Sequence, residues 1–342
     1  MKKTLLILLL MATARAQESP VAAPTVAPVS RLTEAEQEQI WQEANAAYYE
    51  EKNYARALEL YHRLAAVGHA EAMESIGWMY RWGEGVTKDY ASAKRWYEKA
   101  GDAGYSAGYW RIGELYYEGG PGLEWNYASA KRWYEKAIAA GNRDGYWKIG
   151  QLYEEGHPGI EKNWATAKQW YEKGIAAGDS FGYGLIGDLY KKGGPGLEKN
   201  WATAKQWYEK AIAAGDSDGY EQIGFLYKEG GPGIERNWAT AKQWYEKAID
   251  AGDSNGYVAI GRLYEEGGPG LEKNWATAKR WYEKTGDAGN SNGYVAIGRL
   301  YEQGGPGLKK DLEQACRYYQ EAGSDWQEVW VWQEAVERTC YR

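Results

Sequence analysis

Residues 163–173 read NWATAKQWYEK, and the same eleven letters return at residues 200–210 and 237–247. A set of prolines follows the same spacing, each 37 residues after the one before: Pro121, Pro158, Pro195, Pro232, Pro269 and Pro306. A period of this size is typical of a stacked array of small supersecondary units. We therefore expect seven repeats over residues 69–323.

One repeat, residues 253–289, shows how each unit is built. Ser254 is expected to cap a first helix that runs to about Glu266. A Gly-Gly-Pro-Gly loop at 267–270 ends this helix, because proline and glycine oppose its continuation. Asn274 is expected to cap a second helix. The whole array is therefore predicted to be all-α.

The motif carried by these helices resembles a known family. Ile-Gly-x-Leu-Tyr at 260–264, followed by Ala278, Trp281-Tyr282 and Lys284, returns in each unit. It is similar to the Sel1-like repeats, relatives of the tetratricopeptide repeats. The resemblance implies a right-handed α/α superhelical solenoid that binds other molecules, with the first helices on its concave side. In one departure, most repeats have a glycine where the family usually has alanine: Gly108, Gly145, Gly182, Gly219, Gly256 and Gly293.

Both ends of the chain differ from the repeats. Residues 1–16 combine a positive start, an apolar run and a final Ala-Arg-Ala, which is typical of a secretory signal peptide. Residues 17–32 are rich in proline and alanine and are expected to form a flexible linker. Residues 33–68 read as an atypical helical pair and residues 324–342 as a capping helix, since arrays need end units that cover their exposed faces.

The signal peptide predicts an exported protein, periplasmic or secreted, with no transmembrane segment in the mature chain. Cys316 and Cys340 are the only cysteines, and we expect them to form a disulfide in an oxidising compartment. The net charge of −7 argues against a nucleic-acid partner.

No catalytic or metal constellation is evident. Five segments match G-x-S-x-G, among them residues 178–182, but each serine is expected between two helices, where capping explains it. The three histidines do not follow these serines, and they offer no zinc-ligand spacing. We expect neither an enzyme nor a cofactor.

Glycine also interrupts the first helices. Tyr257, Ile260, Gly261 and Tyr264 lie on one helical face that hardly changes from repeat to repeat. A glycine in mid-helix costs about 1 kcal/mol relative to alanine. We expect this face to be the core, and the glycine to let another backbone approach closely.

Four other columns of the first helix vary between repeats, at positions i, i+3, i+4 and i+7. In the repeat 253–289 the first to fourth columns are Asn255, Val258, Ala259 and Arg262. This spacing places them in one stripe on the side away from the invariant face. We call it the variable stripe and expect it to be exposed. The residues expected to bind a partner are Trp78, Trp110, Arg111, Glu114, Asp144, Trp147, Lys148, Phe181, Leu185, Asp188, Glu221, Phe225, Arg262 and Arg299.

Neutral drift of solvent positions is the alternative explanation of this stripe. Exposed positions of the second helix test it, because Thr166, Gln169 and Lys173 recur unchanged in the next two repeats. Variation on one surface favours diversification for recognition, since solenoids bind with extended surfaces.

Three functions remain open. The first is an exported, non-enzymatic scaffold that binds a protein partner on the stripe. The second is a glycan- or peptidoglycan-binding solenoid, because tryptophan and tyrosine faces stack on sugar rings. The third is a hydrolase like the β-lactamase-associated Sel1-like proteins, but these carry a cysteine pair per repeat, which this chain lacks.

Overall fold

The computed structural model describes residues 32–322 and Cys340. The chain divides into two compact units, Met1–His69 and Ala70–Arg342. The signal peptide expected over residues 1–16, and all of the expected linker except Leu32, lie outside the described residues. The expected capping helix over 324–342 also lies outside them, apart from Cys340.

The first unit contains a helical pair. Helix α1 (Glu34–Asn45) continues into a π-helical turn, η1 (Ala46–Glu50), and is followed by α2 (Tyr54–Ala66). A capping box begins α1, because Thr33 and Glu36 exchange side-chain and backbone hydrogen bonds.

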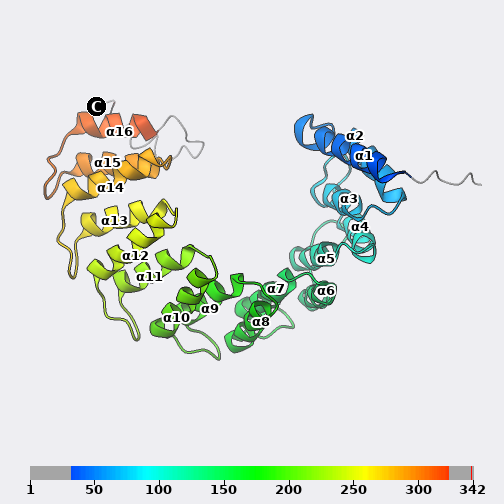
Figure 1. Cartoon of the computed structure of the whole chain (residues 1–342), viewed down its shortest axis with the longest axis horizontal. Helices are drawn as coiled ribbons and strands as arrows, with labels where there is room; N and C mark the ends of the chain where they lie inside the picture. The colour runs from blue at the N-terminus through cyan, green and yellow to red at the C-terminus, as the bar shows by residue number, and fades with distance from the viewer. Residues whose placement is uncertain (1–31, 323–339, 341–342) are drawn as a thin grey trace, which may run out of the picture. The chain divides into compact units, whose positions relative to one another are not determined.

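The second unit is a series of helix pairs in which each helix packs against the next along the chain. Figure 1 shows them stacked in sequence order. This arrangement confirms the predicted all-α solenoid. The bounds are α3 Ala70–Trp82, α4 Tyr90–Asp102, α5 Ala107–Glu118, α6 Tyr127–Ala139, α7 Asp144–Glu155, α8 Trp164–Ala176, α9 Phe181–Lys192, α10 Trp201–Ala213, α11 Asp218–Glu229, α12 Trp238–Asp250, α13 Asn255–Glu266, α14 Trp275–Asp287, α15 Asn292–Gln303 and α16 Leu312–Ala322.

The second helix of each pair begins as expected. The Asn274 side chain accepts a hydrogen bond from the backbone N–H of Thr277 at 2.9 Å. The equivalent residues of the other repeats cap their helices in the same way: Asp89, Asn126, Asn163, Asn200, Asn237 and Asp311.

The capping prediction for the first helices is wrong. Ser254 makes no side-chain capping hydrogen bond, because its backbone is already helical (φ −67°, ψ −17°) rather than extended. Asp253 takes this role instead, and its Oδ1 accepts from the backbone N–H of Asn255 at 2.9 Å. The residue before the expected cap does the same in four other repeats: Asn142, Asp179, Asp216 and Asn290.

The mid-helix glycines allow a ring, not a backbone, to approach. A Cβ atom at Gly261 would lie 2.4 Å from the ring of Tyr282, so our expectation for this column was wrong. The close backbone contact occurs at Gly256, where a Cβ would lie 2.6 Å from the carbonyl oxygen of Tyr245. Both glycine columns therefore bring the second helices against the first, and the tyrosines between them are buried.

Each Gly-Gly-Pro-Gly loop contacts the preceding repeat. The backbone N–H of Trp164 donates to the carbonyl oxygen of Pro195 at 2.8 Å, and the Trp164 indole donates to the carbonyl of Glu154 at 2.8 Å. Gly194 lies flat on this indole, since a Cβ there would approach the ring to 2.6 Å. The loop thus joins successive repeats as well as successive helices.

At the end of the array, Cys316 in α16 forms the expected disulfide with Cys340, with a Cα–Cα distance of 5.3 Å. None of the helices within residues 32–322 is long and apolar enough to cross a membrane.

Candidate functional site

The variable stripe runs along the first helices of the pairs, from α3 to α15. Its first column is mostly exposed, and its middle columns are half-buried. Phe181 and Phe225 are its most exposed large apolar side chains, at 53% and 39%. The expectation of exposure is wrong for Glu114, which is only 8% exposed, and for Ala296, because neighbouring repeats cover them.

In the N-terminal part of the stripe, the charged residues pair with one another between repeats. Glu74 of α3 accepts a hydrogen bond from Arg111 Nε of α5 at 2.9 Å. The Arg111 guanidinium also lies 5.0 Å from the ring centre of Trp78 and 4.9 Å from that of Trp110. Burial raises the pKa of Glu74, and the charge of Arg111 opposes this shift. Arg111 thus lies between two indole rings and is neutralised by a buried acid.

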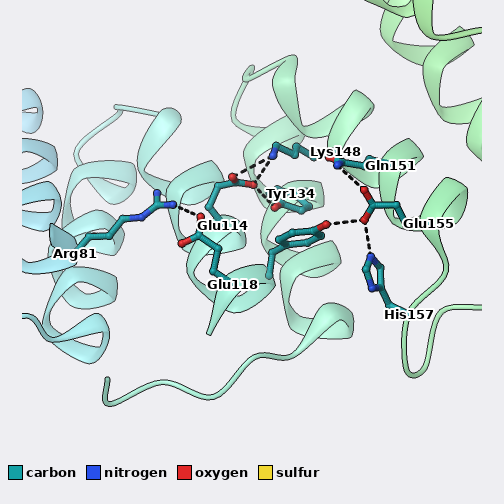
Figure 2. Close-up of polar contacts among 9 residues, drawn as sticks. Arg81, Glu114, Glu118, Tyr134, Lys148, Gln151, Glu155 and His157 are labelled. Carbon is teal, nitrogen blue, oxygen red and sulfur yellow. Dashed lines mark hydrogen bonds and ion pairs between the residues drawn. The ribbon is translucent and has the colours of Figure 1, made fainter. Parts of the chain in front are cut away.

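A second pair follows one repeat further along. Lys148 Nζ of α7 lies 3.0 Å from Glu114 of α5, and the Tyr134 hydroxyl donates to the same carboxylate (Figure 2). Lys148 also lies 4.3 Å from the ring centre of Trp147. We call Glu74, Trp78, Trp110, Arg111, Glu114, Trp147 and Lys148 the self-paired segment.

Figure 2 shows that polar contacts continue beyond the stripe. Glu155 accepts hydrogen bonds from the Tyr117 hydroxyl at 2.6 Å and from Gln151 at 2.8 Å, and lies 2.8 Å from the His157 ring. His157 stands where the other loops have glycine, and it stacks on Tyr127 at 3.9 Å between ring centres. The sequence marks this cluster by its one Gly-His-Pro-Gly loop, at residues 156–159, but the cluster was not predicted.

In two repeats, the fourth column supplies the acceptor for the hydroxyl of a buried tyrosine: Glu114 for Tyr134 and Asp188 for Tyr208. Where the residue 17 positions before the tyrosine is glutamate, that glutamate accepts the hydroxyl, as Glu154 does from Tyr171 at 2.9 Å. Where that position holds Lys191, the fourth column supplies Asp188, which accepts from Tyr208 at 2.7 Å. Glu114 and Asp188, both expected to bind a partner, therefore have an internal structural role.

The middle of the stripe is more apolar. The Phe181 ring packs edge-on against Trp147, with 5.8 Å between ring centres. Leu185 packs against a buried core cluster that includes Trp164 and Tyr171. Phe225 lies near Lys191, whose Nζ is 5.6 Å from its ring centre. Asp144 is exposed at the start of α7.

In the C-terminal part, two successive first helices carry the same stripe. Helix α13 has Asn255, Val258, Ala259 and Arg262, and α15 has Asn292, Val295, Ala296 and Arg299. We call these eight residues the open segment. Together with neighbours that include Glu221, they line a pocket of about 360 Å³.

Arg262 and Arg299 are exposed, and within residues 32–322 neither has a carboxylate at ion-pair distance. Among the described residues that line this pocket, Glu221 is the one acid. Burial raises the pKa of Glu221, and the nearby Asp253 and Asp218 carboxylates raise it further, while Arg262 opposes them. The pocket therefore combines two arginines that have no acidic partner among the described residues with one carboxylate whose pKa is raised.

Thr166, Gln169 and Lys173 of the second helices are the positions whose constancy argued against neutral drift. At Lys173 the constancy has a structural cause. Lys173 Nζ lies 4.1 Å from the ring centre of Trp170, and the same contact recurs in neighbouring repeats. Gln169 is exposed. The unchanged lysine is therefore explained by its contact with the indole, and fewer exposed second-helix positions count against neutral drift than expected.

No group of three or more His, Cys, Asp or Glu side chains within the described part of the chain could hold a metal ion.

The stacked helix pairs and the stripe along their first helices define an α-helical repeat protein whose exposed stripe is a candidate binding surface. The chain belongs to the Sel1 repeat family, as the resemblance implied. The family model for the Sel1 repeat matches residues 47–69, 70–105, 106–142, 143–179, 181–216, 217–253, 254–290 and 291–324. The first match, over residues 47–69, adds an eighth repeat. It lies largely within residues 33–68, which were expected to form an atypical helical pair.

Two solved structures are similar to this chain. One is a protective antigen present in uropathogenic Escherichia coli strains, with an SLR fold: identity is 28%, the TM-score is 0.54, and the match covers 90% of this chain and 67% of that chain. The other is a Sel1 repeat protein from Oxalobacter formigenes: identity is 28%, the TM-score is 0.51, and the match covers 72% of this chain and 96% of that chain.

A curated relative matches over a short stretch. It is the ERAD-associated E3 ubiquitin-protein ligase component HRD3 of Candida glabrata, 45% identical over 56 residues. The match spans 16% of this chain and 7% of the yeast protein. It supports the repeat assignment, and Sel1 repeats generally mediate protein interactions.

Proposed function

We propose that this protein is an exported, non-enzymatic scaffold that binds a protein partner on the face lined by its first helices. The observation that carries the proposal is the exposure of Phe181 and Phe225, the only two phenylalanines of the chain, on the variable stripe. Exposed aromatic side chains are typical of interaction surfaces, where such residues supply much of the binding energy.

The self-paired segment contributes to this surface indirectly. Trp78, Trp110 and Trp147 have the cations of Arg111 and Lys148 over their rings. A sugar ring would have to displace these cations before stacking. The aromatic residues that support a protein partner are therefore the exposed phenylalanines, and we do not carry the glycan alternative further.

Export rests on two independent features. The first sixteen residues have the pattern of a secretory signal peptide. The disulfide between Cys316 and Cys340 is of the kind that persists in oxidising compartments.

Affinity capture tests the proposal. The baits are the mature protein, the variant Phe181→Ala/Phe225→Ala, and a control, Gln169→Ala/Gln206→Ala, on the exposed side of the second helices. All three should show the same helical content by circular dichroism. We expect the parent and the control to capture the same protein from an envelope extract and the phenylalanine variant to lose it. Equal capture by all three baits, or capture by none, would contradict the proposal.

A further inference from the structure

We propose that the open segment binds an extended, acidic stretch of polypeptide, with two of its carboxylates held by Arg262 and Arg299. This inference rests on the proposed function and names the chemistry of the partner at one part of the surface. Four features of the pocket, as lined by the described residues, support it: the repetition of its lining, its short apolar side chains, its two arginines and its acid, Glu221.

The repetition comes first. Among the repeats, only the two that contain α13 and α15 share the same residues in all four columns of the stripe. The pocket therefore presents the same amide, apolar and guanidinium groups twice, one repeat apart. An extended polypeptide also presents groups at a regular interval, since successive residues advance by about 3.3 Å. A periodic site of this kind suits a periodic ligand.

The short side chains that line the pocket leave room for the backbone of a peptide ligand. Val258, Ala259, Val295 and Ala296 are short side chains, in contrast to the Trp110-Arg111 and Trp147-Lys148 pairs that fill the same two columns in earlier repeats. At the pocket edge, Asn255 and Asn292 each carry a side-chain amide. An amide offers one acceptor and two donors, which match the N–H and C=O groups of a peptide unit.

The cations select for acids. A guanidinium binds a carboxylate through two parallel hydrogen bonds, and this geometry favours arginine wherever a carboxylate is recognised. Arg111 already has such a partner in Glu74, at 2.9 Å. Arg262 and Arg299 line the pocket and have no carboxylate partner within the described residues. A ligand can supply these missing carboxylates without breaking an internal ion pair.

Glu221 sets the limit of the acidic stretch. It lines the pocket, and Asp218 and Asp253 lie near it. These acids repel a third carboxylate, so the ligand residue beside Glu221 is expected to be neutral or basic. They also disfavour a nucleic-acid strand, whose phosphates would follow the whole length of the pocket.

Fluorescence anisotropy with the full chain tests the inference. The probe is a fluorescein-labelled decapeptide of alternating glutamate and alanine, and the matched probe has glutamine in place of glutamate. We expect the glutamate probe to bind at least tenfold more tightly than the glutamine probe. Binding should weaken as sodium chloride is raised, because salt screens exposed charges.

Arginine variants locate the binding. In Arg262→Gln/Arg299→Gln the glutamate probe should bind at least tenfold more weakly. The matched control, Arg132→Gln/Arg280→Gln, removes the same charge from exposed second-helix positions and should bind within twofold of the parent. Arg262→Lys/Arg299→Lys keeps the charge but loses the bidentate geometry, so it should weaken binding several-fold. Circular dichroism checks that all variants keep the parent's helical content.

Three outcomes would overturn the inference: no binding of the glutamate probe at about 1 mM (a free energy near −4 kcal/mol), equal binding of both probes, or equal weakening in the control variant. The proposed function fails separately. If the phenylalanine variant loses a captured protein while the glutamate probe does not bind, the scaffold proposal stands and the acidic-peptide inference falls.

Discussion

The self-paired and open segments occupy the same columns of the same stripe, yet their charges are used in opposite ways. In the self-paired segment, Arg111 and Lys148 bind Glu74 and Glu114 of the preceding repeat and lie over indole rings. In the open segment, the arginines have no acidic partner within the described residues, and short side chains leave a pocket beside them.

The difference leads us to infer two causes of variation between repeats. Part of it is internal, because a residue in one repeat must complement its neighbour in the next. We propose that the rest, as in the open segment, serves a ligand.

Removing Glu114 should have the largest effect. Glu114→Ala leaves Lys148 and the buried Tyr134 hydroxyl without their acceptor, and breaking a buried pair in this way costs about 3 kcal/mol. In the same column, Arg299→Ala should change the free energy of unfolding by less than about 0.5 kcal/mol. Urea denaturation of both variants measures this contrast. Equal destabilisation would remove the distinction between the segments.

The buried tyrosines provide a second contrast. Tyr134→Phe deletes a hydroxyl that donates to a charged acceptor, so we expect a loss of about 1.5 kcal/mol. Tyr245 is also buried, but its hydroxyl has no hydrogen-bond acceptor within the described residues, so Tyr245→Phe should cost less than about 0.5 kcal/mol. The urea midpoints of the two variants decide the matter, and a larger loss for Tyr245→Phe would count against the coupling of the fourth column to the tyrosines.

A double-mutant cycle measures the pairing directly. Glu74→Gln and Arg111→Met should show a coupling energy of about 1 kcal/mol, since the pair is partly buried and hydrogen-bonded. The same cycle on Glu221 and Arg262 should give less than about 0.3 kcal/mol, because no ion pair joins them. Similar coupling energies in both cycles would show that the open segment is paired as well.

The smallest effect concerns Glu221. Its pKa is raised in the folded state, so the group favours folding only below its unfolded pKa of about 4.3, and this contribution is lost as the pH rises through the folded pKa. Glu221→Gln should therefore stabilise the protein at pH 7 by up to about 0.5 kcal/mol. The gain should disappear near pH 3, where both forms are neutral. Thermal unfolding at the two pH values tests the sign.

Much of the fold could be predicted because the same features recur in each repeat of a single sequence. The 37-residue period, the asparagine caps and the glycine-proline loop each have a local physical cause that a single sequence displays. The serine caps were predicted wrongly because the residue before them, such as Asp253, could serve equally well, and only the backbone angles decide between the two.

The site was harder to predict because exposure in a solenoid depends on the next repeat. Helical spacing places Glu114 on the outer face of its own helix, but Lys148 of the following repeat covers it. The aligned repeats show that the repeat of Tyr208 has Lys191 where others have glutamate, and that it has an acid, Asp188, three positions earlier. Only the structure shows why Asp188 is there, because the Tyr208 hydroxyl donates a hydrogen bond to it.

Nitrogen-15 spectra of the arginine Nε–H groups, with residues assigned by single substitution, test the central claim most directly. In the free protein, the Arg111 signal should exchange slowly with water because its Nε donates to Glu74, whereas the Arg262 and Arg299 signals should exchange fast. On titration with the glutamate-alanine decapeptide, Arg262 and Arg299 should shift and Arg111 should not. A shift of Arg111, or slow exchange at all three arginines in the free protein, would contradict the division of the stripe into a self-paired and an open segment.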